Sequence, residues 1–200
     1  MLAIIKSIIT NVLSALYQVF GFSVLLAVLF MFFYLYVSEH GGGLAGIKTV
    51  LAKWGTSFKS SSVFRRSFLL SFYTAMILFR TLLNRNLWMN PLSDVMTGWT
   101  LTNAKGELTT ESIENLMLFI PFSILLLWAV KDKLLKDKKG LGTILWQSTR
   151  IVFCFSLSIE FLQLFFRLGT FQLSDIFYNT LGGFLGGLIY GIGYKVQKKS

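Results

Sequence analysis

The sequence predicts an all-α protein whose helices cross a membrane as a bundle. Of its 200 residues, 54% are hydrophobic and only 14% are charged, and the mean hydropathy is +0.64. A soluble domain carries about a quarter charged residues. The apolar residues also form runs close to the roughly 20 helical residues that a bilayer core requires. Because hydrocarbon offers no hydrogen-bond partner to free backbone groups, helices are the expected form.

The apolar runs predict a polytopic bundle of about five spans. The first run has no charged residue, and residues 1–11 before it either extend its helix or lie at the membrane surface. A hairpin within residues 1–37 is the alternative, and it would give six spans. The third helix is expected to begin at about Glu111, ahead of its apolar run. The predicted runs are 12–37, 67–83, 116–130, 141–166 and 176–194.

The basic residues gather in the connections, and this predicts the orientation. Loop 38–66 has five basic residues and one acidic residue, and turn 131–140 has five basic and two acidic. Segment 84–115 instead has two basic and four acidic residues. Lys and Arg favour cytoplasmic loops, so we expect the N-terminus outside and the C-terminus inside. The net charge of +10 is therefore explained by basic residues in the loops beside the membrane. The expected partner is the lipid bilayer, and no nucleic acid is expected.

The chain divides into two predicted parts. Residues 1–66 hold the first span and a basic, amphipathic cytoplasmic segment of the kind that lies on an anionic membrane surface. Residues 67–200 form a four-helix membrane core. Cys154 is the only cysteine and His40 the only histidine, so we expect no internal disulfide, no metal and no cofactor.

Polar residues interrupt the apolar runs near their predicted outer ends. A carboxylate in hydrocarbon costs roughly 2.5–3.5 kcal/mol on insertion scales, so such residues indicate function by default. We therefore predict a polar pocket open to the outer leaflet. Its candidate ligand-binding residues are Arg80, Asn90, Glu114, Asn115, Glu160, Gln163, Arg167, Asp175 and Asn179.

Helical spacing places these residues on shared faces. Glu160, Gln163 and Arg167 follow i, i+3, i+7, and Glu160 is expected to hydrogen-bond with Arg80 or Arg167. Asp175 and Asn179 continue into small residues that favour close helix packing. The packing glycines are Gly182, Gly183, Gly186 and Gly187. The alternative is purely structural: the arginines would only satisfy buried carboxylates.

An ordered set of motifs resembles the VanZ-like family of bacterial membrane proteins. The motifs are Phe79-Arg-Thr, Asn90-Pro-Leu, Glu114-Asn-Leu-Met-Leu-Phe-Ile-Pro-Phe, Ser158-Ile-Glu-Phe-Leu-Gln, Arg167 and Leu173-Ser-Asp-Ile-Phe-Tyr-Asn-Thr-Leu-Gly-Gly-Phe-Leu-Gly. They cover residues 79–190, and the first 66 residues match only loosely. Ser123 departs from the pattern, because the family usually has Gly there. The matching positions are Arg80, Asn115, Glu160, Gln163, Arg167, Asp175 and Asn179.

The resemblance implies a multi-pass protein of the bacterial cytoplasmic membrane that lowers susceptibility to teicoplanin-type glycopeptides. It supplies no mechanism and no catalytic assignment. We expect a non-enzymatic protein that binds an amphiphile or masks the cell-wall precursor. The amphiphile would be a lipid-linked wall precursor or the tail of a lipoglycopeptide. Two alternatives remain: a membrane enzyme acting on a lipid-linked substrate, with Glu160 as base and Asp175 as the other candidate catalytic group, and an ion-coupled transporter.

Overall fold

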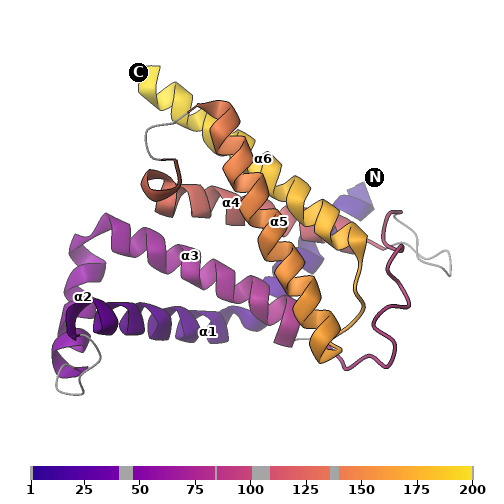
Figure 1. The fold of residues 1–200 in the computed structure, drawn as a ribbon, viewed down its shortest axis with the longest axis horizontal. Helices are drawn as coiled ribbons and strands as arrows, with labels where there is room; N and C mark the ends of the chain where they lie inside the picture. Colours follow the sequence, from indigo (N-terminus) through magenta and orange to yellow (C-terminus); the bar gives the residue numbers. More distant parts are fainter. Residues whose placement is uncertain (1, 41–46, 84, 101–108, 136–139, 200) are drawn as a thin grey trace.

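The computed structural model is a helical bundle (Figure 1). It describes residues 2–40, 47–83, 85–100, 109–135 and 140–199. In chain order the elements are α1 (Leu2–His40), α2 (Ile47–Ser60), α3 (Ser62–Leu78), the π-helical turn η2 (Phe79–Leu83), α4 (Glu111–Leu135), α5 (Leu141–Phe166) and α6 (Leu173–Lys199). These described ranges contain no β-strand.

Four helices of the described part are long and apolar enough to cross a membrane. They cover Ile5–Val37, Ser62–Leu83, Glu111–Val130 and Leu141–Phe166. The protein is therefore described as a multi-pass helical membrane protein. The expected fifth span corresponds to α6, which is richer in glycine and begins with polar residues. Its crossing of the membrane remains a prediction.

The first helix is continuous. α1 runs through Gly21 without a break, so residues 2–11 extend the first helix, and the structure contradicts the hairpin alternative. α3 begins at Ser62, five residues earlier than the apolar run indicates. The Ser61 hydroxyl caps it by accepting a hydrogen bond from the Phe64 N–H at 3.2 Å. Arg65 Nη1 donates to the carbonyls of Phe58 and Lys59 at the end of α2.

The amphipathic segment forms α2 and packs on the protein. Its Trp54 and Phe58 rings stack with centroids 5.4 Å apart, and both meet Phe68 of α3 edge-on. Met31 and Leu35 of α1 are buried in the same cluster. These aromatic side chains of α2 thus pack against α1 and α3, and both remain half-buried.

α6 approaches α4 and α5 closely because glycines face both partners. A Cβ atom at Gly182 would lie 2.5 Å from the Leu116 carbonyl oxygen of α4, and one at Gly183 would lie 2.6 Å from the Val152 Cβ of α5. Gly186 and Gly187 repeat this contact one turn later, against Ile120 and Ser148. One pair of glycines therefore faces α4 and the other faces α5, which allows α6 to pack closely against both helices. Figure 1 shows α6 beside α4 and α5.

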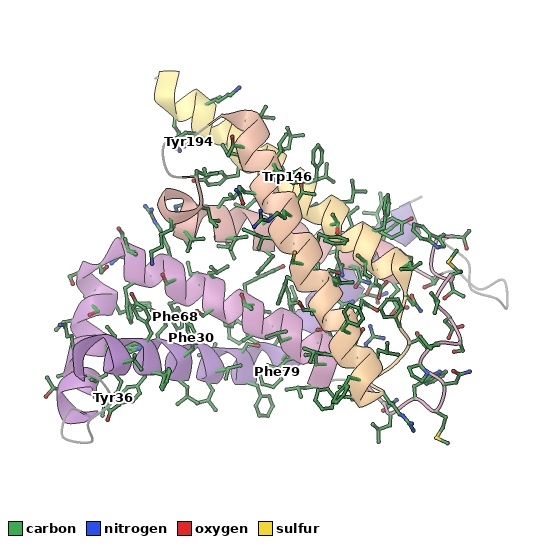
Figure 2. All side chains as sticks on the ribbon, viewed as in Figure 1. Phe30, Tyr36, Phe68, Phe79, Trp146 and Tyr194 are labelled. Atoms are coloured by element: carbon green, nitrogen blue, oxygen red, sulfur yellow. The ribbon has the colours of Figure 1, made fainter. Side chains whose placement is uncertain are left out.

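Large apolar side chains also cover the outside of the bundle. Figure 2 shows Trp146 on the outer side of α5, and both Trp146 and Phe30 of α1 are more than half exposed. Such a surface is costly in water and suits lipid. The buried core is smaller and centres on Ile77, Leu118, Phe119, Phe122, Val152 and Ile159.

Candidate functional site

The polar residues meet at one end of the bundle, which we call the junction. Here η2 follows α3, α4 begins, α5 ends and α6 begins (Figure 1). The antiparallel order of these four elements brings together polar residues that lie up to 99 positions apart in the sequence. α1 adds its Asn11, which reaches the start of α4.

Arg80 pairs with Glu114 at the centre of the junction. Arg80 Nη2 lies 2.9 Å from Glu114 Oε2, and both side chains are largely buried. The other carboxylate oxygen accepts from the Thr110 hydroxyl at 2.6 Å and from Asn11 Nδ2 at 3.0 Å. A largely buried ion pair depends on such additional hydrogen bonds, because both charges have lost their water.

Gln163 connects α5 to the π-helical turn. Its Nε2 donates a buried hydrogen bond of 2.8 Å to the Thr81 carbonyl oxygen. A π-helical turn leaves backbone groups out of the regular α-helical ladder, and such turns are frequent at functional sites. Arg80 lies in this turn, one residue before the carbonyl that Gln163 holds.

Glu160 does not pair with Arg80 or Arg167, contrary to the sequence-based expectation. Its Oε2 accepts the backbone N–H of Gln172 at 2.9 Å, and only 2% of Glu160 is exposed. Arg80 instead takes the carboxylate that opens α4. The connection after α5 folds back, and its Gln172 N–H is the donor to Glu160. Helical periodicity alone does not predict this contact, because Gln172 lies outside the helix.

Asp175 and Asn179 lie on the inner face of α6. The Asp175 carboxylate faces the Asn115 side chain of α4, and its charge interacts with that of Glu160 on α5. Asn179 Nδ2 donates to the Ser156 hydroxyl at 2.9 Å. Glu160 and Asp175 are thus two neighbouring buried carboxyl groups, and neither has an ion pair within the described residues.

Several buried polar atoms at the junction have no hydrogen-bond partner within the described part of the chain. They are Arg80 Nη1, Ser174 Oγ, Asp175 Oδ1 and Asn179 Oδ1. A buried polar group without a partner costs about 1–3 kcal/mol, so four of them close together are unusual for a purely structural cluster.

A loop closes the junction on its open side. Segment 87–99, which we call the cap segment, is bonded through its backbone to the α5–α6 connection: Trp88 N–H to Arg167 C=O at 2.8 Å, Phe171 N–H to Pro91 C=O at 2.8 Å and Leu173 N–H to Val95 C=O at 3.0 Å. The Ser112 hydroxyl of α4 donates to the Gly98 carbonyl. At the edge, Arg85 Nη2 lies 3.5 Å from Glu111 Oε1.

Two candidate residues lie apart from the others. Arg167 caps α5 in the left-handed conformation (φ 55°, ψ 38°), and it is exposed. Because α5 ends at Phe166, the i+7 spacing from Glu160 no longer defines a shared face. Asn90 is exposed in the cap segment, where its carbonyl accepts the Ser93 N–H. The structure thus gathers Arg80, Glu114, Asn115, Glu160, Gln163, Asp175 and Asn179 at the junction, without Asn90 and Arg167.

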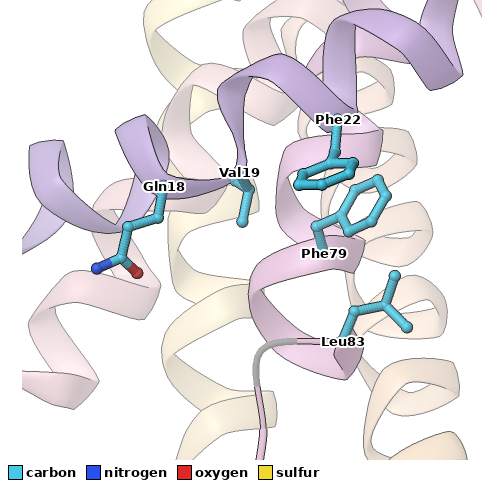
Figure 3. A pocket seen from close by; sticks show the side chains of 5 residues that line it. All are labelled: Gln18, Val19, Phe22, Phe79 and Leu83. Carbon is cyan, nitrogen blue, oxygen red and sulfur yellow. The ribbon is translucent and has the colours of Figure 1, made fainter.

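A cavity lies beside the polar cluster and not within it. It has a volume of about 260 Å³ and is lined by Gln18, Val19 and Phe22 of α1 and by Phe79 and Leu83 of η2 (Figure 3). Figure 3 shows the rings of Phe22 and Phe79 facing each other, and their centroids are 5.9 Å apart. The cavity is mainly apolar, unlike the expected polar pocket, but it borders the turn that carries Arg80.

The sequence interpretation missed residues that complete the junction. Asn11 belongs to residues 1–11, which the sequence predicts either to extend the first helix or to lie at the membrane surface, and an amide in an apolar run is itself a signal. Ser156 precedes Glu160 by four residues and so shares its helix face. The Thr110 hydroxyl, just before α4, donates to the Glu114 carboxylate, and its carbonyl accepts the Glu114 N–H.

Comparison with known proteins places the chain in a family. The family model VanZ/LLP1 matches residues 20–194. The chain belongs to the VanZ/LLP1 family. Protein VanZ of Enterococcus faecium is 34% identical to it over 85 residues, which are 42% of this chain and 47% of that relative. The matched stretch thus spans about half the length of the relative, and no solved structure matches the chain.

Ser123, where the resemblance to the family implies Gly, has a defined contact in this VanZ/LLP1 protein. Its hydroxyl donates a buried hydrogen bond of 2.9 Å to the Gly183 carbonyl of α6. A Cβ at Gly186 would lie 2.8 Å from the Ser123 Cβ. The serine therefore adds a hydrogen bond between α4 and α6 at the point where the glycines bring them closest.

Proposed function

We propose that this protein is a non-enzymatic component of the bacterial cell envelope that binds an amphiphile and so lowers susceptibility to teicoplanin-type glycopeptides. Membership of the VanZ/LLP1 family and similarity to protein VanZ of Enterococcus faecium support this proposal. The amphiphile is a lipid-linked cell-wall precursor or the acyl tail of a lipoglycopeptide. Binding it lowers access of the antibiotic to its target at the membrane surface.

The observation that carries the proposal is a mainly apolar cavity that borders the π-helical turn carrying the largely buried Arg80. Phe79 and Leu83 line the cavity, and Arg80 lies between them in the same π-helical turn. An amphiphile needs both an apolar recess for its chain and polar groups for its head. The volume of about 260 Å³ is close to the lower end of the roughly 300–1,000 Å³ typical of ligand pockets.

The proposed placement is a cytoplasmic membrane crossed by α1, α3, α4, α5 and α6. The N-terminus and the junction face outward, and the C-terminus faces the cytoplasm. The clustering of basic residues in loop 38–66 and turn 131–140 supports this orientation. In this arrangement the cavity opens at the depth where lipid-linked wall precursors have their head groups.

The test is antibiotic susceptibility in a host that expresses the protein. Phe22→Ala removes one wall of the cavity, and Phe30→Ala removes a similarly exposed ring two turns further along α1. Protection against teicoplanin should fall for Phe22→Ala and persist for Phe30→Ala at equal membrane levels. A glycopeptide without the acyl chain distinguishes tail capture from precursor masking, because only masking would protect against both. Equal protection by the two variants would contradict use of this cavity.

A second candidate is an enzyme that acts on a lipid-linked substrate. The neighbouring buried carboxyl groups of Glu160 and Asp175 favour it, because acid–base catalysis often uses two carboxyls in different environments. Here Glu160 would act as base. Mass spectrometry of lipid extracts distinguishes the candidates: a product present with the parent protein and absent with Glu160→Gln would establish catalysis.

A further inference from the structure

The cap segment, residues 87–99, combines a bonded backbone with outward apolar side chains. Its backbone groups at residues 88, 91, 95 and 98 bond to the neighbouring elements. Large apolar residues beside and between these positions are exposed: Leu87 by 79%, Met89 by 92% and Met96 by 72%. Trp88, Leu92 and Trp99 are also exposed. The bonded backbone holds the side chains outward, so the exposure does not reflect a loosely placed loop.

Asp94 is the only charged residue between positions 86 and 100, so the surface of the cap segment is unusually apolar for a water-exposed loop. A contiguous exposed apolar surface of this kind indicates contact with lipid or with another protein.

The apolar surface continues into the lipid-facing sides of the helices. The Leu87–Leu168 bridge places one end of the cap segment against the end of α5, where Phe165 and Phe166 are exposed. At the other end, the Trp99 ring lies 5.5 Å from the ring of Phe177 on α6. Exposed apolar side chains thus extend from the end of α5 across the cap segment to α6, and this continuity with the helices favours lipid over a protein partner.

We propose that the cap segment inserts into the head-group region of the bilayer and is covered by lipid. Trp side chains prefer this region because one part of the ring system is apolar and the N–H needs a polar partner. The two tryptophans at the ends of the segment then anchor it at a fixed depth. The junction beneath it is therefore reached from the lipid and not from the aqueous phase. The inference holds for either leaflet and does not require the proposed function.

Site-directed fluorescence in vesicles of phosphatidylcholine and phosphatidylglycerol tests the proposal. A bimane label is placed at Met89→Cys and, separately, at Met96→Cys, in a Cys154→Ser background of the full chain. Both methionines are exposed, so neither label has to displace packed atoms. Lys133→Cys, exposed near the end of α4, is the matched control.

We expect lipids with brominated acyl chains to quench the labels at 89 and 96 several-fold more than the label at 133. Aqueous iodide should show the reverse order. Strong iodide quenching at 89 and 96, equal to that at 133, would overturn the proposal. Protection from both quenchers would overturn it too, because the segment would then be covered by protein, such as a second copy of this chain.

Discussion

Arg80 Nη2 lies 2.9 Å from Glu114 Oε2, which joins the π-helical turn after α3 to the first turn of α4. Arg80 thus neutralises the carboxylate of Glu114 and not that of Glu160. Glu160, which the sequence predicts to be the partner of an arginine, instead accepts a hydrogen bond from the backbone N–H of Gln172. Glu114 is therefore the buried carboxylate that carries an ion pair at the junction, and Glu160 has none among the described residues.

Glu114→Gln should destabilise the protein. The change leaves the Arg80 guanidinium largely buried without a countercharge, and we expect the free energy of unfolding to fall by roughly 3 kcal/mol. Glu111→Gln is the control, because its pair with Arg85 is longer and more exposed and should contribute less than about 1 kcal/mol. Thermal unfolding in detergent measures both. If the two variants unfold alike, the Arg80–Glu114 pair is not a stabilising contact.

Glu160→Gln should leave the protein folded. The glutamine oxygen still accepts the Gln172 N–H, and repulsion from Asp175 is removed, so the stability should change by less than about 1 kcal/mol. Quantitative blotting of membranes together with teicoplanin susceptibility measures level and function. We expect a normal level with loss of protection. Asp175→Asn gives a parallel case on α6. Full protection by both variants would assign the carboxyl groups to packing.

Gly186→Ala should be destabilising even though alanine favours helices. The added Cβ would overlap the Ile120 carbonyl oxygen and lie 2.8 Å from the Ser123 Cβ, so α4 and α6 must separate, at a cost of about 1–3 kcal/mol. Gly21→Ala in α1 is the matched control, because nothing lies within 4 Å of its Cβ position, and it should gain up to about 1 kcal/mol. Melting temperatures in detergent should move in opposite directions. A stabilised Gly186→Ala variant would contradict the close packing.

Arg167→Gly should stabilise the end of α5. A left-handed residue other than glycine costs roughly 1–2 kcal/mol, and glycine removes most of this cost. The exposed arginine side chain has no ion pair among the described residues that would be lost. Thermal unfolding should therefore shift upward. Antibiotic susceptibility of the same variant shows whether the arginine has a separate function.

Cysteine labelling tests the orientation. In a Cys154→Ser background, a membrane-impermeant maleimide should label Asn103→Cys on intact cells and should label Lys136→Cys only after lysis. Position 136 is expected in the cytoplasm because turn 131–140 has an excess of basic residues, which favour cytoplasmic loops. Labelling of position 136 but not 103 on intact cells would reverse the proposed orientation and place the junction in the cytoplasm.

Much of the helical fold follows from local features of the sequence. Leu141–Phe166 is bounded by a basic turn and a short connection, so its limits were predicted directly. The start of α3 was misplaced, because the Ser61 cap and the two arginines after it lie outside the apolar run. Ser61 accepts the Phe64 N–H and Arg65 reaches back to α2, so local polar contacts override the hydropathy boundary.

The sequence by itself determined the helical class of the protein, four of the five predicted spans and the presence of costly polar residues near one end of them. These depend on composition and period, which each segment carries alone. Only the tertiary structure decided the partners. Arg80 forms an ion pair with Glu114, and Glu160 accepts a hydrogen bond from the Gln172 N–H. Asn11 of α1 donates a hydrogen bond to Glu114. Such choices depend on helix ends, a π-helical turn and a loop that folds back, so they are set by distances in space and not by spacing along the chain.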